Sequence, residues 1–458
     1  MPDDMMTTAA GSGCARLART LRRLTPALTP ALALLALAAC DPSKLLHVQD
    51  PDVATPGSLR TKEALPTVRN GVVGDFALAY GGSGNETEEG QISFSGLLSD
   101  EFVNSETFGT RIEIDQRLTR ENNADNSDVF LELSRARAFA DFGSARYNEF
   151  DAGNEGHAEV LNLGAYAYVL FAENYCSGVP FSTLNDDGTI TFGDPLTTQQ
   201  MLEQAIVRFD SATAIAGAAE SAAQALLAAV GKARALVDLG QYADAAAVLA
   251  AAAVPDDFRY ELQYSSNSTR QNNGVWEFTW NEGRWSVADA EGGNGLPFVS
   301  ENDPRVQVVD GGTGFDNSTP LLLQTLYPDR GSFIPLATGT EARLIEAEAA
   351  LAADDVAAFL GKLNGLRAAV GMPPLGDPGT PEARQDLLFH ERAFWLFLTS
   401  HRLGDLRRLI RQYGRDPESV FPTGNYFKGG TYGPGVNLPI PVNELNNPKS
   451  TGCLNRDA

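Results

Sequence analysis

Apolar residues recur every three to four positions along most of this chain, which is the spacing that gives an α-helix one buried face. The pattern predicts amphipathic helices that end where Gly, Pro or Asn interrupts them. An uninterrupted helix is also expected over 382–413. Further helices are expected over 127–149, 157–175, 198–216 and 221–238. The pattern therefore favours a mostly α-helical protein.

Two of the helical segments have the composition of tight hairpins. Small residues recur between Ala233 and Ala252, and Gly240 permits a short connection there. A similar element covers 341–370, with a break at Asp354-Asp355. The spacing resembles the second half of a tetratricopeptide (TPR) unit, although Ala-rich hairpins of any helical bundle match it loosely. We expect a TPR-like helical-hairpin solenoid with loop-rich, minor-β insertions.

Residues 256–335 differ in composition, being rich in Asn, Gly, Ser and Trp, and are expected to form an irregular insert. Alternation over 275–280 predicts a short strand, on which Trp276 and Trp280 face the same side. Such a pair, flanked by amides and carboxylates, would form a platform for the apolar face of a sugar. A buried aromatic core is the alternative, and ordinary burial tendencies favour it. The ligand-binding candidates are Trp276, Trp280, Trp285, Asn281 and Glu282.

The first forty residues have the order of a secretory signal peptide, with a cluster of arginines followed by an apolar run over 27–39. The run is shorter than the roughly 20 residues that span a bilayer. Its end, Leu-Ala-Ala before Cys40, resembles the lipobox of bacterial lipoproteins. The resemblance implies that residues 1–39 are removed and that Cys40 carries acyl chains, such as palmitate. A soluble secreted protein with a coincidental cysteine is the alternative. Residues 40–62 are expected to form an extended lead-in.

The positions of the four cysteines matter more than their number. Cys14 would leave with the signal peptide, and Cys40 would be lipidated. The two that remain, Cys176 and Cys453, predict one disulfide in an oxidising compartment. Two unrelated buried thiols are the alternative. Neither cysteine lies in a spacing typical of zinc ligands.

Acidic residues outnumber basic ones by 59 to 35, which gives a formal net charge of −24. The first 39 residues hold four Arg and two Asp, so the chain without them carries −26. Nucleic acid binding needs a basic face and is not expected. The same charge repels anionic lipid headgroups, so membrane attachment is expected through a lipid anchor alone. Without an HExxH, nucleophile-elbow or P-loop motif in the sequence, no catalytic residue, metal ligand or cofactor is assigned.

Several short segments of the C-terminal half form an ordered set. They are Asn302-Asp303-Pro304-Arg305, Ile334-Pro335-Leu336, 344–349, His390-Glu391-Arg392, His401-Arg402, Asp405-Leu406-Arg407-Arg408 and 438–448. In this order they resemble the signature of the SusD/RagB family, although Ser400 stands where the family usually has Gly. Arg and Asp residues of this run are expected to tie the helix to neighbouring loops through charge-assisted hydrogen bonds.

This resemblance implies a non-catalytic lipoprotein on the surface of the bacterial outer membrane. Such a protein captures glycan or peptide oligomers and passes them to a SusC-like TonB-dependent β-barrel transporter. Two alternatives remain: a secreted glycoside hydrolase of helical fold, which needs a suitable pair of carboxylates, and a TPR-type adaptor for another protein. The expected domains after the lead-in are a helical half (63–255), the Trp-containing insert (256–335) and a second helical half with a Gly/Pro-rich tail (336–458).

Overall fold

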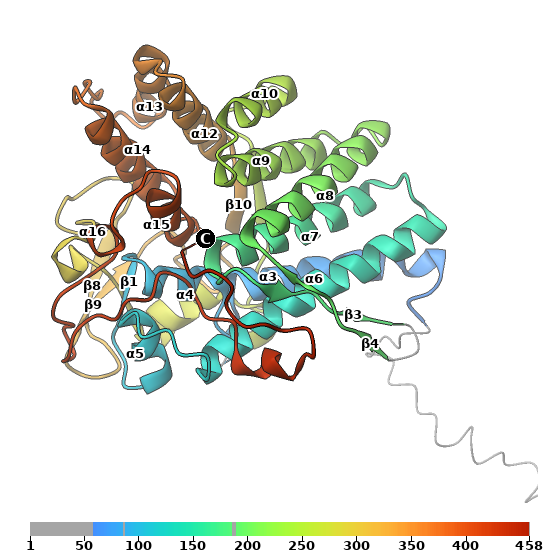
Figure 1. The fold of residues 1–458 in the computed structure, drawn as a ribbon, viewed down its shortest axis with the longest axis horizontal. Helices are drawn as coiled ribbons and strands as arrows, with labels where there is room; N and C mark the ends of the chain where they lie inside the picture. The colour runs from blue at the N-terminus through green and yellow to red at the C-terminus, as the bar shows by residue number, and fades with distance from the viewer. Residues whose placement is uncertain (1–57, 86–87, 186–188, 458) are drawn as a thin grey trace, which may run out of the picture. The chain divides into compact units, whose positions relative to one another are not determined.

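The computed structural model describes residues 58–85, 88–185 and 189–457, so Cys40 and the predicted signal peptide lie outside the described residues. Helices account for most of the described chain, which confirms the mostly α-helical prediction (Figure 1). Among these residues, no helix is both long enough and apolar enough to cross a bilayer.

Antiparallel helices that follow one another in sequence pack side by side and form the body of the protein (Figure 1). Helix α7 is buried along most of its length, and its Tyr166 and Phe171 belong to the main hydrophobic core. The helices of the body are α3 (Leu65–Gly81), α6 (Ala124–Phe150), α7 (Glu155–Asn174), α8 (Thr198–Ala218), α9 (Ala222–Asp238), α10 (Tyr242–Ala252), α12 (Gly339–Ala352) and α13 (Val356–Ala369).

Local sequence signals explain where several of these helices begin and how they connect. Thr197 and Gln200 form a capping box at the start of α8. Helices α9 and α10 are joined through Gly240, whose φ of +73° is readily adopted by glycine. The side chain of Asp355 accepts a hydrogen bond from the backbone N–H of Ala358 and caps α13. Both predicted hairpins are therefore present.

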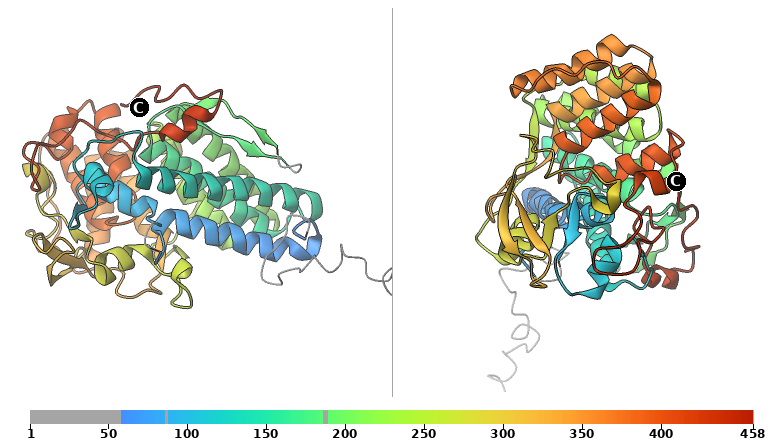
Figure 2. Two further views of the ribbon diagram at one scale, coloured as in Figure 1. Left: turned by 90° about the horizontal axis from the view of Figure 1, so that it is seen from below. Right: turned by 90° about the vertical axis from the view of Figure 1, so that its left-hand side faces the viewer.

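Minor β structure is present, as predicted, and it consists of short antiparallel pairs. Strand β1 (Phe102–Asn104) pairs with β7 (Trp285–Val287), β6 (Arg259–Leu262) with β10 (Ile334–Thr338), and β8 (Val308–Thr313) with β9 (Pro320–Gln324). Two smaller pairs are β2 (Val179–Pro180) with β5 (Pro195–Leu196), and β3 (Thr183–Leu184) with β4 (Ile190–Thr191). The β8–β9 ribbon and the C-terminal helices lie at one end of the long helices (Figure 2).

The predicted strand over 275–280 is wrong, because this segment is helical. It comprises the single turn α11 (Gly274–Trp276) and the π-helical segment η3 (Glu277–Asn281). The side chain of Asn273 accepts a hydrogen bond from the backbone N–H of Trp276 and caps this turn. The cap and the tertiary contacts of the segment outweigh the β propensity of its aromatic residues.

The uninterrupted helix predicted over 382–413 is also wrong. Helix α14 (Pro381–Trp395) ends before α15 (Arg402–Arg411) begins, and the connection contains Leu398 and Ser400 with φ of +54° and +56°. Buried partners hold this break: Glu101 accepts a hydrogen bond from the backbone N–H of Leu398 at 2.8 Å, and Arg234 donates to the carbonyl of Ser400 at 3.1 Å. Long-range polar contacts therefore stabilise a break that the apolar periodicity does not reveal.

Charged side chains of α14 and α15 form buried ion pairs, which gives them a structural role. Asp405 accepts hydrogen bonds from Arg392 at 2.8 Å and from Arg408 at 2.7 Å. Arg402 donates to Asp100 at 2.6 Å. These bonds join the two helices to each other and to the loop that follows the N-terminal helix α4 (Gln91–Leu98).

The C-terminal tail returns to the centre of the body (Figure 1). Leu438 pairs with Tyr175 in a parallel bridge, and Asn455 pairs with Ser177 in an antiparallel one. Between these bridges, Cys176 and Cys453 are joined in a disulfide with Cα atoms 5.5 Å apart. The remaining short helices are α5 (Gly109–Asp115), α16 (Pro417–Val420), and the 3₁₀ turns η1 (Lys62–Ala64), η2 (Thr269–Gln271), η4 (Glu291–Gly293) and η5 (Val442–Asn446).

Candidate ligand-binding sites

Trp285, one of the predicted ligand residues, is fully buried in the core. Its ring stacks on Phe278 with centroids 4.4 Å apart and contacts Phe102 at 6.1 Å. On β7 it lies opposite Asn104 of β1. A ligand on the surface cannot reach this ring, so the core alternative left open by the sequence holds for Trp285.

Trp276 and Trp280 are half-buried and tether one loop. The indole N–H of Trp276 donates to the carbonyl of Pro328 at 3.0 Å, and that of Trp280 donates to Gln324 at 2.8 Å. Because the segment is helical, residues four apart lie on one face. The two indoles thus hold the end of β9 and the segment that follows it. The guanidinium of Arg330 lies 5.0 Å from the ring centroid of Trp276.

The two polar candidates lie at the end of the same helical segment. Asn281 is exposed and donates to Glu277 at 2.7 Å. Glu282 accepts a short hydrogen bond from Arg284 Nε. Through this bond Glu282 contacts Arg284, which lies over the exposed aromatic rings described next.

Phe108 and Phe315 form an exposed aromatic pair that sequence analysis missed. They are 48% and 47% exposed, and their ring centroids lie 6.3 Å apart at an angle of 35°. The guanidinium of Arg284 lies 4.9 Å from the Phe108 centroid and 4.6 Å from that of Phe315. We call Phe108, Phe315 and Arg284 the aromatic patch. Its residues come from the start of α5, the loop after β8 and the residue before β7.

Buried charges hold the aromatic patch in place. Arg284 Nη1 donates to Glu106 at 2.7 Å, and Glu106 also accepts from Arg111 at 3.1 Å. The Nζ of Lys428 donates to Asp316 at 2.7 Å and to the carbonyl of Glu106 at 2.5 Å. These bonds fix the loops that carry both phenylalanines.

A third exposed phenylalanine lies next to this framework. Phe427 is 47% exposed, and the ammonium group of Lys428 lies 5.7 Å from its ring centroid. Through Lys428, the loop of Phe427 is joined to Asp316, the neighbour of Phe315. The three phenylalanines belong to separate loops that are far apart in the sequence, so no local motif identifies them together.

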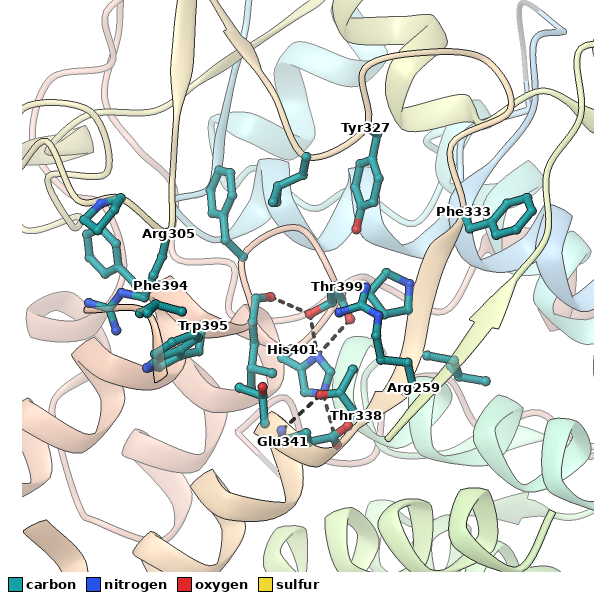
Figure 3. A pocket seen from close by; sticks show the side chains of 18 residues that line it. Arg259, Arg305, Tyr327, Phe333, Thr338, Glu341, Phe394, Trp395, Thr399 and His401 are labelled. Carbon is teal, nitrogen blue, oxygen red and sulfur yellow. Dashed lines mark hydrogen bonds and ion pairs between the residues drawn. The ribbon is translucent and has the colours of Figure 1, made fainter. Parts of the chain in front are cut away.

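A cavity of about 330 Å³ lies between β10, the start of α12 and the end of α14 (Figure 3). Its aromatic wall includes Tyr327, Phe394 and Trp395. Exposed apolar side chains of Leu326, Phe333 and Val370 also line it. The polar lining consists of Thr338, Thr340, Glu341, Thr399, His401, Arg259 and Arg305.

Thr399, His401 and Glu341 lie close together along one part of the cavity lining (Figure 3). His401 Nδ1 lies 2.8 Å from Thr399 Oγ1, and Nε2 lies 3.2 Å from Glu341 Oε1. Burial and the neighbouring Arg234 lower the pKa of His401. Burial alone would raise the pKa of Glu341, but His401, Arg234 and Arg392 together lower it. Glu341 is therefore ionised near neutral pH.

The described residues contain no group of three or more His, Cys, Asp or Glu side chains arranged to hold a metal ion.

Comparison with known proteins places the fold. No family model and no curated protein matches the chain, whereas 60 chains of solved structures do. A SusD superfamily protein from Parabacteroides distasonis matches with a TM-score of 0.64 at 14% identity, covering 85% of this chain and 98% of its own. One from Bacteroides thetaiotaomicron matches with a TM-score of 0.62 at 15% identity, covering 86% and 98%.

A third structure, described as a SusD-like carbohydrate-binding protein from Bacteroides fragilis, matches with a TM-score of 0.62 at 15% identity, covering 84% of this chain and 98% of its own. The chain thus shares a mostly helical fold with these three proteins. More particularly, it has the SusD fold, as the sequence resemblance implied.

Proposed function

We propose that this protein is a non-catalytic glycan-capturing lipoprotein of the SusD type. The observation that carries the proposal is the aromatic patch, a pair of exposed rings held rigidly on a SusD fold. Solved structures of this fold include proteins described as carbohydrate-binding or sugar-binding.

The aromatic patch suits a sugar because each pyranose ring has an apolar face that packs on an aromatic ring. Burying such a ring face stabilises the complex by about 25 cal/mol for each Å² of apolar surface removed from water. The positive charge of Arg284 is matched by Glu106 and Glu282, so the patch presents two apolar rings without a free charge. This arrangement favours a neutral oligosaccharide over an acidic one.

The anchor and the partner belong to the same proposal. Acylated Cys40 would tether the protein to the outer membrane, and the lead-in over 40–62 would connect this anchor to the body. The captured glycan would pass to a SusC-like TonB-dependent transporter. A Cys40→Ser variant is then expected in the soluble fraction of cells, with the wild-type protein in the outer-membrane fraction together with the barrel. Wild-type protein that fractionates as soluble would contradict the anchor.

Incubation of the purified protein with a panel of neutral oligosaccharides tests capture without catalysis. We expect saturable binding of at least one oligosaccharide by isothermal titration calorimetry and no release of reducing ends over hours. Release of reducing ends would overturn the proposal in favour of a glycoside hydrolase, which requires two carboxylates flanking the scissile bond.

A further inference from the structure

Two buried carboxyl groups lie together where α5 meets η4. Asp115, the last residue of α5, is 1% exposed, and Glu291, the first residue of η4, is 6% exposed. The two carboxyl groups are hydrogen-bonded to each other. No nitrogen or hydroxyl donor of the described residues reaches Asp115 Oδ1 or Glu291 Oε2. Because two ionised carboxylates are both acceptors, a hydrogen bond between them requires a proton on one of the two. We call Asp115 and Glu291 the acid pair.

A hairpin over residues 424–432 is tied to the acid pair by two tyrosines. The hydroxyl of Tyr426 donates to Asp115 Oδ2 at 2.6 Å, and the hydroxyl of Tyr432 donates to Glu291 Oε1 at 2.9 Å. Each carboxyl group therefore has one oxygen bound to the hairpin and one oxygen left for the other carboxyl group. The hairpin and the shared proton thus act on the same two side chains.

The charged groups around the acid pair already have partners of opposite charge. These groups are Lys428, Arg117 and Asp100. Their partners, at 2.7, 3.3 and 2.6 Å, are Asp316, Glu418 and Arg402. Burial raises the pKa of both carboxyl groups, and the neighbouring Asp115 raises the pKa of Glu291 further. Loss of the shared proton would therefore place two buried negative charges side by side without a free counter-charge, which is unfavourable.

We propose that the acid pair is a pH-sensitive latch, which holds the hairpin on the body while the pair shares one proton and lets it open more often when that proton is lost. The open state exposes both carboxylates to water and releases the proton. The equilibrium constant for opening therefore rises about tenfold per pH unit between the ordinary pKa of glutamate and the raised pKa of the closed pair. The hairpin carries the exposed Phe427, so opening displaces this ring from the neighbourhood of the aromatic patch. The latch does not rest on the proposed function, because it needs no glycan.

Hydrogen–deuterium exchange of the full-length protein, followed by mass spectrometry without glycan, tests the latch. Directly after the hairpin, the N–H of Gly433 donates to the carbonyl of Gln116 at 2.8 Å, and that of Gly435 donates to the carbonyl of Arg117 at 3.0 Å. These amides exchange when the segment leaves the body. A peptide over 421–436 therefore reports opening, and α9 in the buried helical body is the internal reference.

Two variants replace the shared proton with a permanent donor. In Glu291→Gln and Asp115→Asn, an amide N–H donates to the remaining carboxylate at any pH, so opening should no longer release a proton. The matched control is Glu101→Gln, which changes another buried carboxyl group whose donor is the backbone N–H of Leu398.

Exchange is compared at pH 6.5 and pH 8 after correction for the pH dependence of intrinsic exchange. Opening of 421–436 in the wild type and in Glu101→Gln should rise about tenfold or more, with little change in the two amide variants. The α9 amides should stay more protected than 421–436 at both pH values. Constant opening in the wild type would overturn the proposal, as would an equal rise in both amide variants. Exchange of 421–436 no faster than that of α9 would mean global unfolding and would also overturn it.

Discussion

The guanidinium carbon of Arg284 lies 4.6 Å from the ring centroid of Phe315, while the same side chain donates to the buried carboxylate of Glu106. One arginine thus supports an exposed aromatic ring and neutralises a charge beneath it. The contact with the ring adds a favourable cation–π interaction, and the ion pair fixes the guanidinium in place. The stability of this surface therefore depends on one side chain, and under the proposed function glycan binding depends on it as well.

Replacing this arginine should destabilise the protein. In Arg284→Met, Glu106 loses one of its two guanidinium partners and Glu282 loses its own, in a buried setting. We expect the free energy of unfolding to fall by about 3 kcal/mol, as when a buried pair is broken. Arg330→Met is the matched control, since Arg330 also lies over an aromatic ring but is exposed. Arg330→Met should change the free energy of unfolding by no more than about 1 kcal/mol. Urea unfolding compares the two, and equal losses would contradict the role of Arg284.

Reducing the disulfide should lower stability without abolishing the fold. The bridge joins residues separated by 277 positions, and closing so long a loop restricts the unfolded chain. The expected loss is about 3–5 kcal/mol in urea unfolding with dithiothreitol. Cys453→Ala, which removes the exposed sulfur, should show the same loss and no further response to reductant. Identical unfolding midpoints for the wild type with and without reductant would show that the bridge does not stabilise the protein.

The buried carboxyl group of Glu101 should make stability depend on pH. Burial, reinforced by the neighbouring Asp100, raises the pKa of Glu101 to about 8, although the Leu398 N–H opposes the shift. Because the folded-state pKa lies above the unfolded value, the contribution of this group is complete below pH 4.5. It declines by about 1.4 kcal/mol per pH unit as the pH rises towards 8.

Glu101→Gln isolates this effect because the amide stays neutral. Between pH 5 and pH 8 the unfolding free energy of the wild type should therefore fall relative to that of the variant. Urea unfolding at pH 5, 6.5 and 8 measures it. Parallel pH profiles for the two proteins would mean that Glu101 does not change its protonation state on folding in this range.

The approach of α8 to α9 depends on Gly231. A Cβ atom there would overlap the ring of Phe209 and lie 2.8 Å from Cζ of Tyr166, both fully buried. Gly231→Ala should therefore cost about 1–3 kcal/mol through overpacking. Gly217→Ala in α8 meets nothing within 4 Å and should be neutral or stabilising by up to about 1 kcal/mol. Thermal unfolding measures the stability of both variants. A Gly231→Ala variant as stable as the wild type would contradict the tight packing at this position.

The parts of the fold that sequence predicts well are those with local causes. The α9–α10 and α12–α13 hairpins follow from amphipathic periodicity and from turn residues such as Gly240 and Asp355, which act within a few positions. The break after α14 has no such local cause. It is held by Glu101 and Arg234, which lie far away in sequence, so an apolar run that looks continuous conceals it.

Sequence analysis found the neighbourhood of the candidate site but not its binding surface. The tryptophan cluster supplied the predicted ligand-binding candidates. In the structure Trp285 is buried, and the other two tryptophans donate hydrogen bonds that hold a neighbouring segment. The exposed rings are Phe108 and Phe315, distant in sequence and brought together by tertiary structure alone. Glu282, one of the predicted residues, is paired with Arg284, which lies over both rings. Residues that come from separate loops have no fixed spacing in the sequence, so a motif search cannot detect the surface that they form.

Calorimetric titration of Phe315→Ala with the oligosaccharide that the wild type binds tests the central claim most directly. Phe192→Ala, another exposed phenylalanine outside the aromatic patch, is its matched control. Loss of one ring face should cost about 1.5 kcal/mol or more, which weakens binding at least tenfold. The account predicts this loss in Phe315→Ala with wild-type affinity in Phe192→Ala and unchanged unfolding of both. Wild-type affinity in Phe315→Ala would contradict it.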